Sequence, residues 1–295
     1  MYWVPYYFLL YVNEIPHLSD LFSACLFADD TSLLFSANNQ EDLSNHCNSG
    51  LELFSDWCQS NRLSINVSKT NYVLFSNCIR SDSLDDILLC DRIVECVPSV
   101  RFLGVELDEN VKFNLHIDKC SRQISKNTGV LRRMAQFVSP GVLRQLYFAF
   151  IEPYLNDCVV CFGGAYDSHI KTLEIAQRKC IRVVGNQGVL SHCNPIFYRL
   201  KILKFKDLYN LNLGIYMFKH MSDFENNVVI THNYETRNRN AYIPEFQELT
   251  LTQRQSIRHQ VPNNWNSIPE NIRNSPSLFI FKRKYREYLL SSYME

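Results

Sequence analysis

The stretch Cys25-Leu26-Phe27-Ala28-Asp29-Asp30-Thr31-Ser32-Leu33-Leu34-Phe35 places two adjacent aspartates between two short apolar runs. The pattern predicts a β-hairpin, with strands over residues 24–28 and 32–36 and the carboxylates at the turn. Neighbouring turn residues point in different directions, so we expect one carboxylate of the pair to face a shared site. Carboxylates at a strand end are ligands for the divalent cations of phosphoryl transfer. The alternative is a plain turn, because Asp-Asp is common in turns.

Length and charge limit what this chain can be. It has 295 residues, of which 46% are hydrophobic and 20% charged, so it has room for a large core and for two subdomains. The net charge is zero, but residues 1–100 carry 13 acidic and 4 basic side chains, and residues 101–220 carry 17 basic and 9 acidic ones. This suits a metal-binding half followed by a phosphate-binding half. Two solvated surfaces of different charge explain the pattern equally well.

The cysteines and the apolar runs bear on the cellular compartment. Eleven scattered cysteines without a regular framework are typical of a reducing, intracellular setting. Cys158 and Cys161 have the spacing of metal ligands, but no second Cys/His pair follows, and their apolar neighbours predict buried thiols. The apolar run 3–12 is too short to cross a bilayer and predicts a core segment, so we expect no membrane partner.

The segments after the hairpin predict a helix and then several strands. Asn39 can cap a helix whose apolar stripe recurs at helical spacing through Leu43, Cys47, Leu51, Phe54 and Cys58. The alternation over residues 63–75 predicts a strand that bears one cation, Lys69. Taken alone, Lys69 is an ordinary solvated lysine at a strand end. Shorter β runs follow at residues 87–90 and 93–97.

Phe102-Leu103-Gly104 lies in a further β run over residues 100–108. A glycine within a strand permits the close approach of another backbone, which fits a nucleic acid lying across it. A β-bulge requires glycine for a different reason, so the residue type leaves both interpretations open.

From about Leu115 the apolar spacing predicts a run of helices. In the first helix Ile117, Ile124, Leu131 and Val138 fall one heptad apart, and Cys120, Val130, Met134 and Phe137 complete the apolar face. Ser139-Pro140 starts the next helix. Asp167 or Ser168 caps another, which stops at Gly185, and two more cover residues 195–203 and 206–220.

A basic stripe runs along the first of these helices. Lys119, Arg122, Lys126 and Arg133 are spaced three, four and seven residues apart, so they share one face. Such a face can follow the phosphates of a nucleic-acid duplex. Basic stripes also occur as plain solvated surfaces.

Several of these segments, taken in order, resemble one known family. Phe27-Ala28-Asp29-Asp30 is similar to the Y/F-x-D-D box of reverse transcriptases, in the form found in non-LTR (LINE-type, jockey-like) retrotransposons. The segment PYYFLLYVNEIP before it, LSINVSKTNYVLF after it and the Phe-Leu-Gly of residues 102–104 each resemble a motif of that family in the same order. Glu152-Pro-Tyr, the helix bearing AQRKCIR, and the tail with YETRN, WNSIP and FKRKY resemble its thumb and C-terminal module.

The resemblance implies a site and a reaction. The reaction is metal-dependent addition of deoxynucleoside triphosphates to a DNA primer on an RNA template, with two Mg²⁺ ions. Asp29 would bridge the metals, Asp30 would support them, and Lys69 would neutralise the pyrophosphate leaving group. Phe102, Leu103 and Gly104 would form the primer grip. Lys119, Arg122, Lys126 and Arg133 would bind nucleic acid.

The resemblance also implies an architecture. We expect an α+β fold: a partial polymerase palm (an antiparallel sheet with helices) over residues 1–108, an all-helical thumb over 109–222 and a C-terminal module over 223–295. The family's third catalytic aspartate and its fingers would precede Met1, so we expect a chain truncated at its N-terminus and inactive alone. The alternatives are a non-catalytic or domesticated RNA- or DNA-binding remnant, and an unrelated α+β protein. The oligomeric state stays open.

Overall fold

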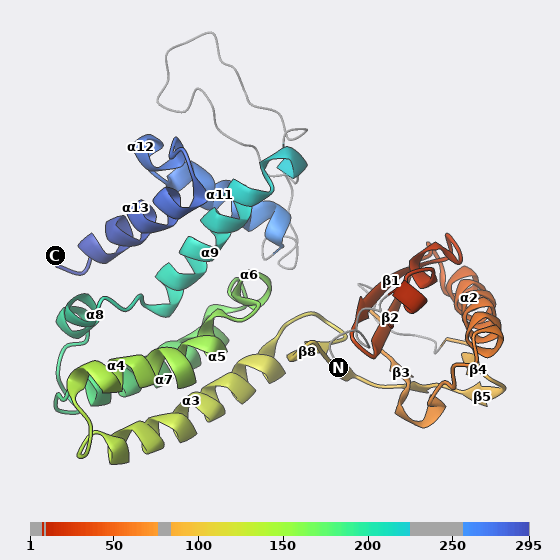
Figure 1. Cartoon of the computed structure of the whole chain (residues 1–295), viewed down its shortest axis with the longest axis horizontal. Helices are drawn as coiled ribbons and strands as arrows, with labels where there is room; N and C mark the ends of the chain where they lie inside the picture. The colour runs from red at the N-terminus through yellow and green to blue at the C-terminus, as the bar shows by residue number, and fades with distance from the viewer. Residues whose placement is uncertain (1–7, 9, 76–83, 225–255, 295) are drawn as a thin grey trace, which may run out of the picture. The chain divides into compact units, whose positions relative to one another are not determined.

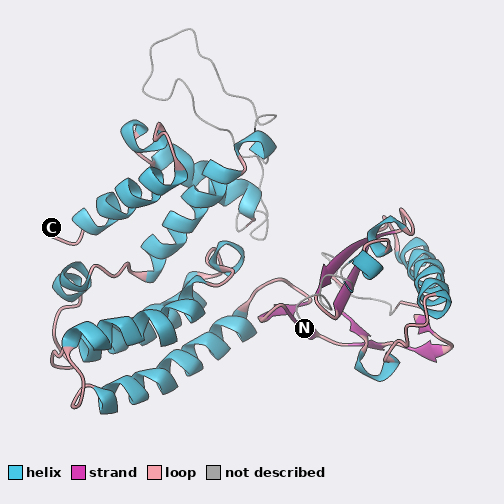
Figure 2. Cartoon of the chain, viewed as in Figure 1, coloured by secondary structure: helices cyan, strands magenta, loops and turns pink. Residues whose placement is uncertain are grey.

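The computed structural model describes residue 8 and residues 10–75, 84–224 and 256–294, shown in Figure 1. The chain divides into two compact units, one of Met1–Val100 with Asp108–Asn110 and one of Arg101–Leu107 with Val111–Glu295. Figure 2 shows short strands in the first unit and helices in most of the second. This mixture of helices and separate two-stranded sheets is compatible with the predicted α+β class.

The β-hairpin and one long helix form the larger part of the first unit. Strands β1 (Phe22–Phe27) and β2 (Asp30–Phe35) pair antiparallel, and α2 (Gln40–Ser60) follows. The Asn39 side chain accepts a hydrogen bond from the Asp42 backbone N–H, which confirms the predicted cap. A Cβ added at Gly50 would lie 2.6 Å from the Phe35 ring, so α2 needs glycine to pack this closely on the hairpin.

The remainder of the first unit consists of very short elements. They are the 3₁₀ turns η1 (Ile15–His17) and η2 (Val67–Lys69) and the strands β3 (Asn71–Tyr72), β4 (Leu88–Leu89), β5 (Arg92–Ile93) and β6 (Glu95–Cys96). Strands β4 and β5 form a hairpin, and β3 pairs parallel with β6. Ile87, Leu89 and Val94 form the buried cluster of this part of the first unit.

The predicted strand over residues 63–75 is wrong. Residues 67–69 form the turn η2 instead, and two residues pair as β3. Asn66 explains the difference: its side-chain oxygen accepts a hydrogen bond from Ser68, and its backbone carbonyl accepts from the Thr70 hydroxyl. Short polar side chains of this kind compete with the ladder of a sheet for backbone groups.

The second unit is built from helices around one core. A hairpin of β7 (Ser99–Phe102) and β8 (Val105–Asp108) precedes it in the chain. The helices and one 3₁₀ turn are α3 (Asn114–Met134), α4 (Pro140–Phe150), α5 (Glu152–Asn156), α6 (Val159–Phe162), α7 (Asp167–Val184), α8 (Asn194–Leu200), α9 (Phe205–Lys219), η3 (Met221–Phe224), α11 (Ile257–Ser267), α12 (Glu270–Arg273) and α13 (Leu278–Ser291). The Ser139 cap of α4 and the end of α7 before Gly185 confirm two predictions, while Asp167 is the first residue of α7 and not its cap.

Helices α3 and α7 pack side by side at one end of this core. Ile117, Ile124 and Leu131 are 0–1% exposed, which confirms three members of the predicted heptad stripe. The fourth, Val138, lies beyond the end of α3 at Met134 and is partly buried against the core. The buried Gln177 of α7 donates to the Leu203 carbonyl and the Tyr147 hydroxyl, and its own carbonyl accepts from the Phe205 N–H. This amide therefore satisfies polar groups of three residues outside α7, within an apolar core.

Helix α9 is covered by α11 and α13, the last helices of the chain. A Cβ added at Gly214 would lie 3.0–3.1 Å from Tyr285, Ile268 and Phe281, so the small residue permits this close packing. Phe281, which is 0% exposed, lies against the rings of Trp265 and Phe218. Residues 256–294 therefore share one core with α9.

Three further predictions have mixed outcomes. Residues 3–7 and 9 of the predicted core segment 3–12 lie outside the described residues, as does the YETRN motif; Val12 is buried and Leu10 is 72% exposed. Cys158 and Cys161 are exposed, so the expectation of buried thiols is wrong. Within the described ranges, no helix has both the length and the apolar content that crossing a bilayer needs.

Candidate active site and nucleic-acid interface

The two aspartates lie at the turn end of the β1–β2 hairpin. Phe27 pairs with Asp30, which leaves Ala28 and Asp29 as a two-residue turn. Ala28 adopts a φ of 53°, in the left-handed region that such tight hairpin turns require. Asp29 and Asp30 are both exposed. The predicted hairpin is confirmed, but only Asp29 lies in its turn. Asp30 is the first residue of β2, and both strands begin two residues and end one residue earlier than the predicted 24–28 and 32–36.

Asp29 and Asp30 offer the oxygen donors that Mg²⁺ prefers. Within residues 10–75, 84–224 and 256–294, no group of three or more His, Cys, Asp or Glu side chains could hold a metal ion. The donor chemistry fits a divalent cation. The rest of its coordination sphere would come from water or from other oxygens, such as those of a bound phosphate.

Lys69 is the last residue of the turn η2 and is exposed. In the part of the chain that the structure describes, no ion pair or hydrogen bond joins Lys69 to Asp29 or Asp30. The backbone of Lys69 is held by a hydrogen bond from its N–H to the Asn66 carbonyl. The structure thus leaves this ammonium group in solvent, on a short helical turn and not on a strand.

Phe102, Leu103 and Gly104 lie at the tip of the β7–β8 hairpin. Phe102 ends β7, and Leu103 and Gly104 form the turn with φ values of 45° and 92°. Positive φ at both central positions is the geometry of the favoured hairpin turns. A Cβ added at Gly104 would meet nothing within 4 Å. Gly104 is thus required by the turn, and neither a close internal contact nor a β-bulge explains it.

The basic stripe of α3 is exposed along its length. Lys119, Arg122, Lys126 and Arg133 all face solvent, as their spacing predicts. Lys119 forms an ion pair with Glu106 of β8, so part of its charge is already neutralised. The Arg122 Nε donates to the Asp118 carbonyl one turn earlier. Arg122, Lys126 and Arg133 are therefore the cations of this face most available to an anionic partner.

Three residues predicted for the apolar face of the first helix are exposed. Val130, Met134 and Phe137 are 43%, 38% and 82% exposed. Val130 comes four residues after Lys126, which places it on the basic stripe, and Phe137 comes after the helix ends at Met134. The exposed surface of α3 therefore combines cations with apolar side chains. The i+4 spacing of Val130 from Lys126 is the sequence signal that reveals it.

A buried Cys–His pair on α3 has no nucleophilic character. The Cys120 Sγ lies 3.6 Å from the His116 Nε2, and both side chains are buried. Burial raises the pKa of Cys120 to about 11 and lowers the pKa of His116. A neutral thiol beside a neutral imidazole lacks the thiolate that cysteine chemistry requires. The His116 ring packs edge-on against Phe162, so the pair is part of the core.

No family model and no solved structure matches this chain. Curated proteins do. It is 24% identical over 187 residues to the RNA-directed DNA polymerase from mobile element jockey of Drosophila melanogaster, which covers 61% of this chain and 20% of that protein. It is 23% identical over 188 residues to the probable RNA-directed DNA polymerase from transposon X-element of the same species, with the same coverage.

A third relative comes from another insect. Over 218 residues the chain is 24% identical to the retrovirus-related Pol polyprotein from type-1 retrotransposable element R1 2 of Nasonia vitripennis, which covers 66% of this chain and 52% of that protein. The chain thus spans about a fifth of the length of the jockey and X-element relatives and about half of the R1 relative. These matches confirm the family resemblance: over 61% of its length, the chain is similar to the RNA-directed DNA polymerases of jockey-like and other non-LTR retrotransposons.

Proposed function

We propose that this chain supplies part of the palm and the thumb of an RNA-directed DNA polymerase. Residues 1–108 would form the palm part, 109–222 the thumb and 223–295 a C-terminal module. The observation that carries the proposal is the exposed Asp29-Asp30 pair at the turn end of the β1–β2 hairpin, within a chain similar to polymerases of that name. In the reaction, the primer 3′-hydroxyl attacks the α-phosphate of a deoxynucleoside triphosphate, a new phosphodiester bond forms and pyrophosphate leaves.

Each proposed site residue has a physical role in that reaction. Asp29 and Asp30 would hold Mg²⁺, which when bound supplies charge stabilisation to the reacting phosphate oxygens. The Lys69 ammonium would neutralise the pyrophosphate as its bond to the α-phosphate breaks. The Phe102–Gly104 turn would hold the primer strand. The exposed positions of Asp29, Asp30 and Lys69 leave all three accessible to a nucleotide.

We expect the purified chain to extend no primer by itself. Two adjacent, exposed carboxylates cannot fix a pair of divalent ions, because each ion needs several oxygen donors in set positions. The measurement is extension of oligo(dT) on poly(rA) in Mg²⁺ and then in Mn²⁺. Incorporation that Asp29→Ala abolishes would contradict the expectation of inactivity and show that the chain completes the site itself.

We expect the chain to bind an RNA–DNA primer–template through the α3 surface. Each phosphate contact in a duplex lowers the slope of log K against log salt by about 0.9. Replacing Arg122, Lys126 and Arg133 with glutamine should therefore flatten the slope by up to about 2.7. Lys119→Gln should have a smaller effect, because Glu106 already offsets that charge.

A matched control comes from the same helix. Arg132 is exposed but lies about 100° away from Arg133 around α3, so Arg132→Gln should leave the slope unchanged. If Arg132→Gln and Arg133→Gln change the salt slope equally, the duplex is attracted by the overall positive charge of α3 and not bound along one face.

The second candidate function is non-catalytic binding of RNA or DNA. It is favoured by the absence, within the described part of the chain, of a third acidic side chain beside Asp29 and Asp30. The test adds a separate polypeptide that carries the remaining parts of a polymerase. Salt-dependent duplex binding, with no primer extension in Mg²⁺ or Mn²⁺ even after that addition, would favour non-catalytic binding.

A further inference from the structure

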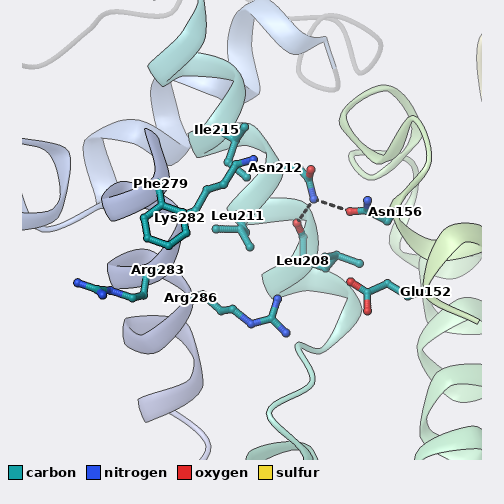
Figure 3. A pocket seen from close by; sticks show the side chains of 10 residues that line it. All are labelled: Glu152, Asn156, Leu208, Leu211, Asn212, Ile215, Phe279, Lys282, Arg283 and Arg286. Atoms are coloured by element: carbon teal, nitrogen blue, oxygen red, sulfur yellow. Dashed lines mark hydrogen bonds between the residues drawn. The ribbon is translucent and has the colours of Figure 1, made fainter. Parts of the chain in front are cut away.

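A cleft far along the chain from the acidic turn combines charge, an aromatic ring and an apolar floor. It has a volume of about 450 Å³ and opens between α5, α9 and α13, as Figure 3 shows. Its floor is apolar and consists of Leu208, Leu211 and Ile215 of α9. The opening leads to solvent, so an extended ligand can enter and leave along it.

One wall of the cleft is a single face of α13. Lys282, Arg283 and Arg286 lie three, four and seven residues after Phe279, so the four side chains share one face of α13 and line the cleft. In Figure 3 Lys282 and Arg286 point toward α9, whereas the Arg283 guanidinium points to the outer side of α13. Phe279 is 72% exposed, and Lys282 and Arg283 are exposed beside it. The Arg286 guanidinium is half-buried and donates to the Lys201 carbonyl, 2.8 Å away. This wall therefore presents a free ring face together with three positive charges.

The opposite wall carries polar groups. Asn212 donates to the Asn156 side-chain oxygen at 2.9 Å and to the Leu208 carbonyl at 2.8 Å, which fixes both amides at the rim, as Figure 3 shows. Glu152 lies across the cleft from Arg286. Burial raises the pKa of Glu152, against the opposing effect of Arg286 and Arg144. With three cations and one carboxylate, the cleft is positive overall.

We propose that this cleft binds a single-stranded segment of RNA or DNA, with one base on the Phe279 ring and the flanking phosphates at Lys282 and Arg283. Base stacking on an aromatic ring beside a cationic groove is the general mode of single-strand binding. A duplex cannot insert its bases into a cleft of this size, whereas one unstacked nucleotide fits. The cations at the open rim suit a backbone that continues past the cleft, which a free nucleotide lacks. The amides and Glu152 provide hydrogen-bonding groups for the edge of the base.

This inference deepens the proposed function. It rests on that function in one respect, the assignment of the ligand as a nucleic acid and not an acidic peptide. Duplex binding by α3 and single-strand binding by the cleft can be disproved separately. Duplex binding through α3 is measured with the Arg122, Lys126 and Arg133 variant, and single-strand binding through the cleft is measured with α13 variants. If the α3 variant binds duplex like the parent chain while the α13 variants lose single-strand affinity, the α3 surface fails and the cleft stands.

The test measures binding of the full chain to labelled 12-nucleotide oligo(U) and oligo(dT) by fluorescence anisotropy at two salt concentrations. Phe279→Leu, which keeps an apolar side chain but loses the ring face, should weaken binding about tenfold. The Lys282→Gln and Arg283→Gln double variant should weaken it further and flatten the salt slope by about 1.4, at about 0.7 per contact in a single strand. Lys284→Gln is the matched control, because Lys284 lies on α13 but does not line the cleft.

Phe279→Trp adds a direct readout. It should retain affinity, and stacking of a base should quench the fluorescence of the new indole when the oligonucleotide is added. Unchanged affinity in both Phe279→Leu and the Lys282/Arg283 variant would overturn the proposal, as would an indole that the oligonucleotide does not quench. Competition by poly-glutamate as effective as that by oligo(U) would also overturn it and reassign the cleft to an acidic peptide.

Discussion

The two units of this chain differ in how much core supports them. In the helical unit, forty of the described residues form one continuous buried cluster that runs from Val105 to Tyr293. In the first unit the corresponding cluster contains Ile87, Leu89 and Val94, and the paired strands outside the β1–β2 hairpin are two residues long. Buried apolar area is the main source of folding free energy. The helical unit should therefore be the more stable of the two.

This difference also separates the two kinds of chemistry. The acidic turn of Asp29 and Asp30 belongs to the unit with the thin core, whereas the basic α3 surface and the α13 cleft are built on the thick one. A rigid scaffold holds charges at fixed spacing, which binding a polymeric anion requires. A metal site needs finer positioning still. The proposed nucleic-acid surfaces therefore have the firmer scaffold, and the proposed metal site has the weaker one.

The largest expected effect is in amide hydrogen exchange. Amides of α3, α7, α9 and α13 should exchange at least about 100-fold more slowly than those of β1 and β2, because they open only with the large core. Limited proteolysis should trim residues 1–100 first and leave a fragment that starts near residue 110. Since Phe281 and Trp265 complete the core around α9, that fragment should retain α13. Equal protection in both units would break the comparison.

A core substitution sharpens the comparison at the level of single side chains. Phe281→Ala should destabilise the helical unit by about 3–5 kcal/mol, because it removes a fully buried ring from between Trp265 and Phe218. Leu89→Ala should cost about 2 kcal/mol, because its small cluster can collapse onto the gap. Urea unfolding followed by circular dichroism measures the first, and exchange at β4 and β5 measures the second. A smaller loss for Phe281→Ala than for Leu89→Ala would reverse the ranking.

The smallest expected effect concerns pH and lies in the cleft of the stable unit. Burial raises the pKa of Glu152 above its ordinary 4.5, so folding favours its protonated form. Its contribution to stability is present below pH 4.5 and is lost as the pH rises through the raised pKa. Glu152→Gln removes this loss and should raise the melting temperature at pH 7 by about 1–3 °C, with no gain at pH 4. An equal gain at both pH values would mean that the carboxylate charge is not the cause.

The sequence predicts those features that depend on local spacing. The β1–β2 hairpin, the Asn39 and Ser139 caps and the buried heptad of α3 each follow from residues within one or two turns of each other. The strand expected over residues 63–75 fails because Asn66 gathers Ser68 and Thr70 into a turn, a competition that alternation alone does not weigh.

Features that depend on contacts between residues far apart in the chain could not be predicted from the sequence. The ion pair that masks Lys119 comes from Glu106 on another element. The floor of the α13 cleft is formed by Leu208 and Leu211, and the sequence near Phe279 does not predict that contact. The cations of α13 are visible in the sequence at i, i+1 and i+4, but only packing against α9 makes them one wall of a cleft. Charges can be counted from the sequence, while their accessibility depends on tertiary contacts.

The close packing at Gly214 has a consequence for synthesis in the cell. Phe281, which covers this part of α9, is translated 67 residues after Gly214. At ribosomal rates of about 5–20 residues per second, the apolar face of α9 waits about 3–13 s for its cover. During that interval the nascent chain presents a hydrophobic helix of the kind that chaperones recognise. Ribosome-associated chaperones should therefore crosslink to α9 in chains stalled before residue 278 and release it once α13 has emerged.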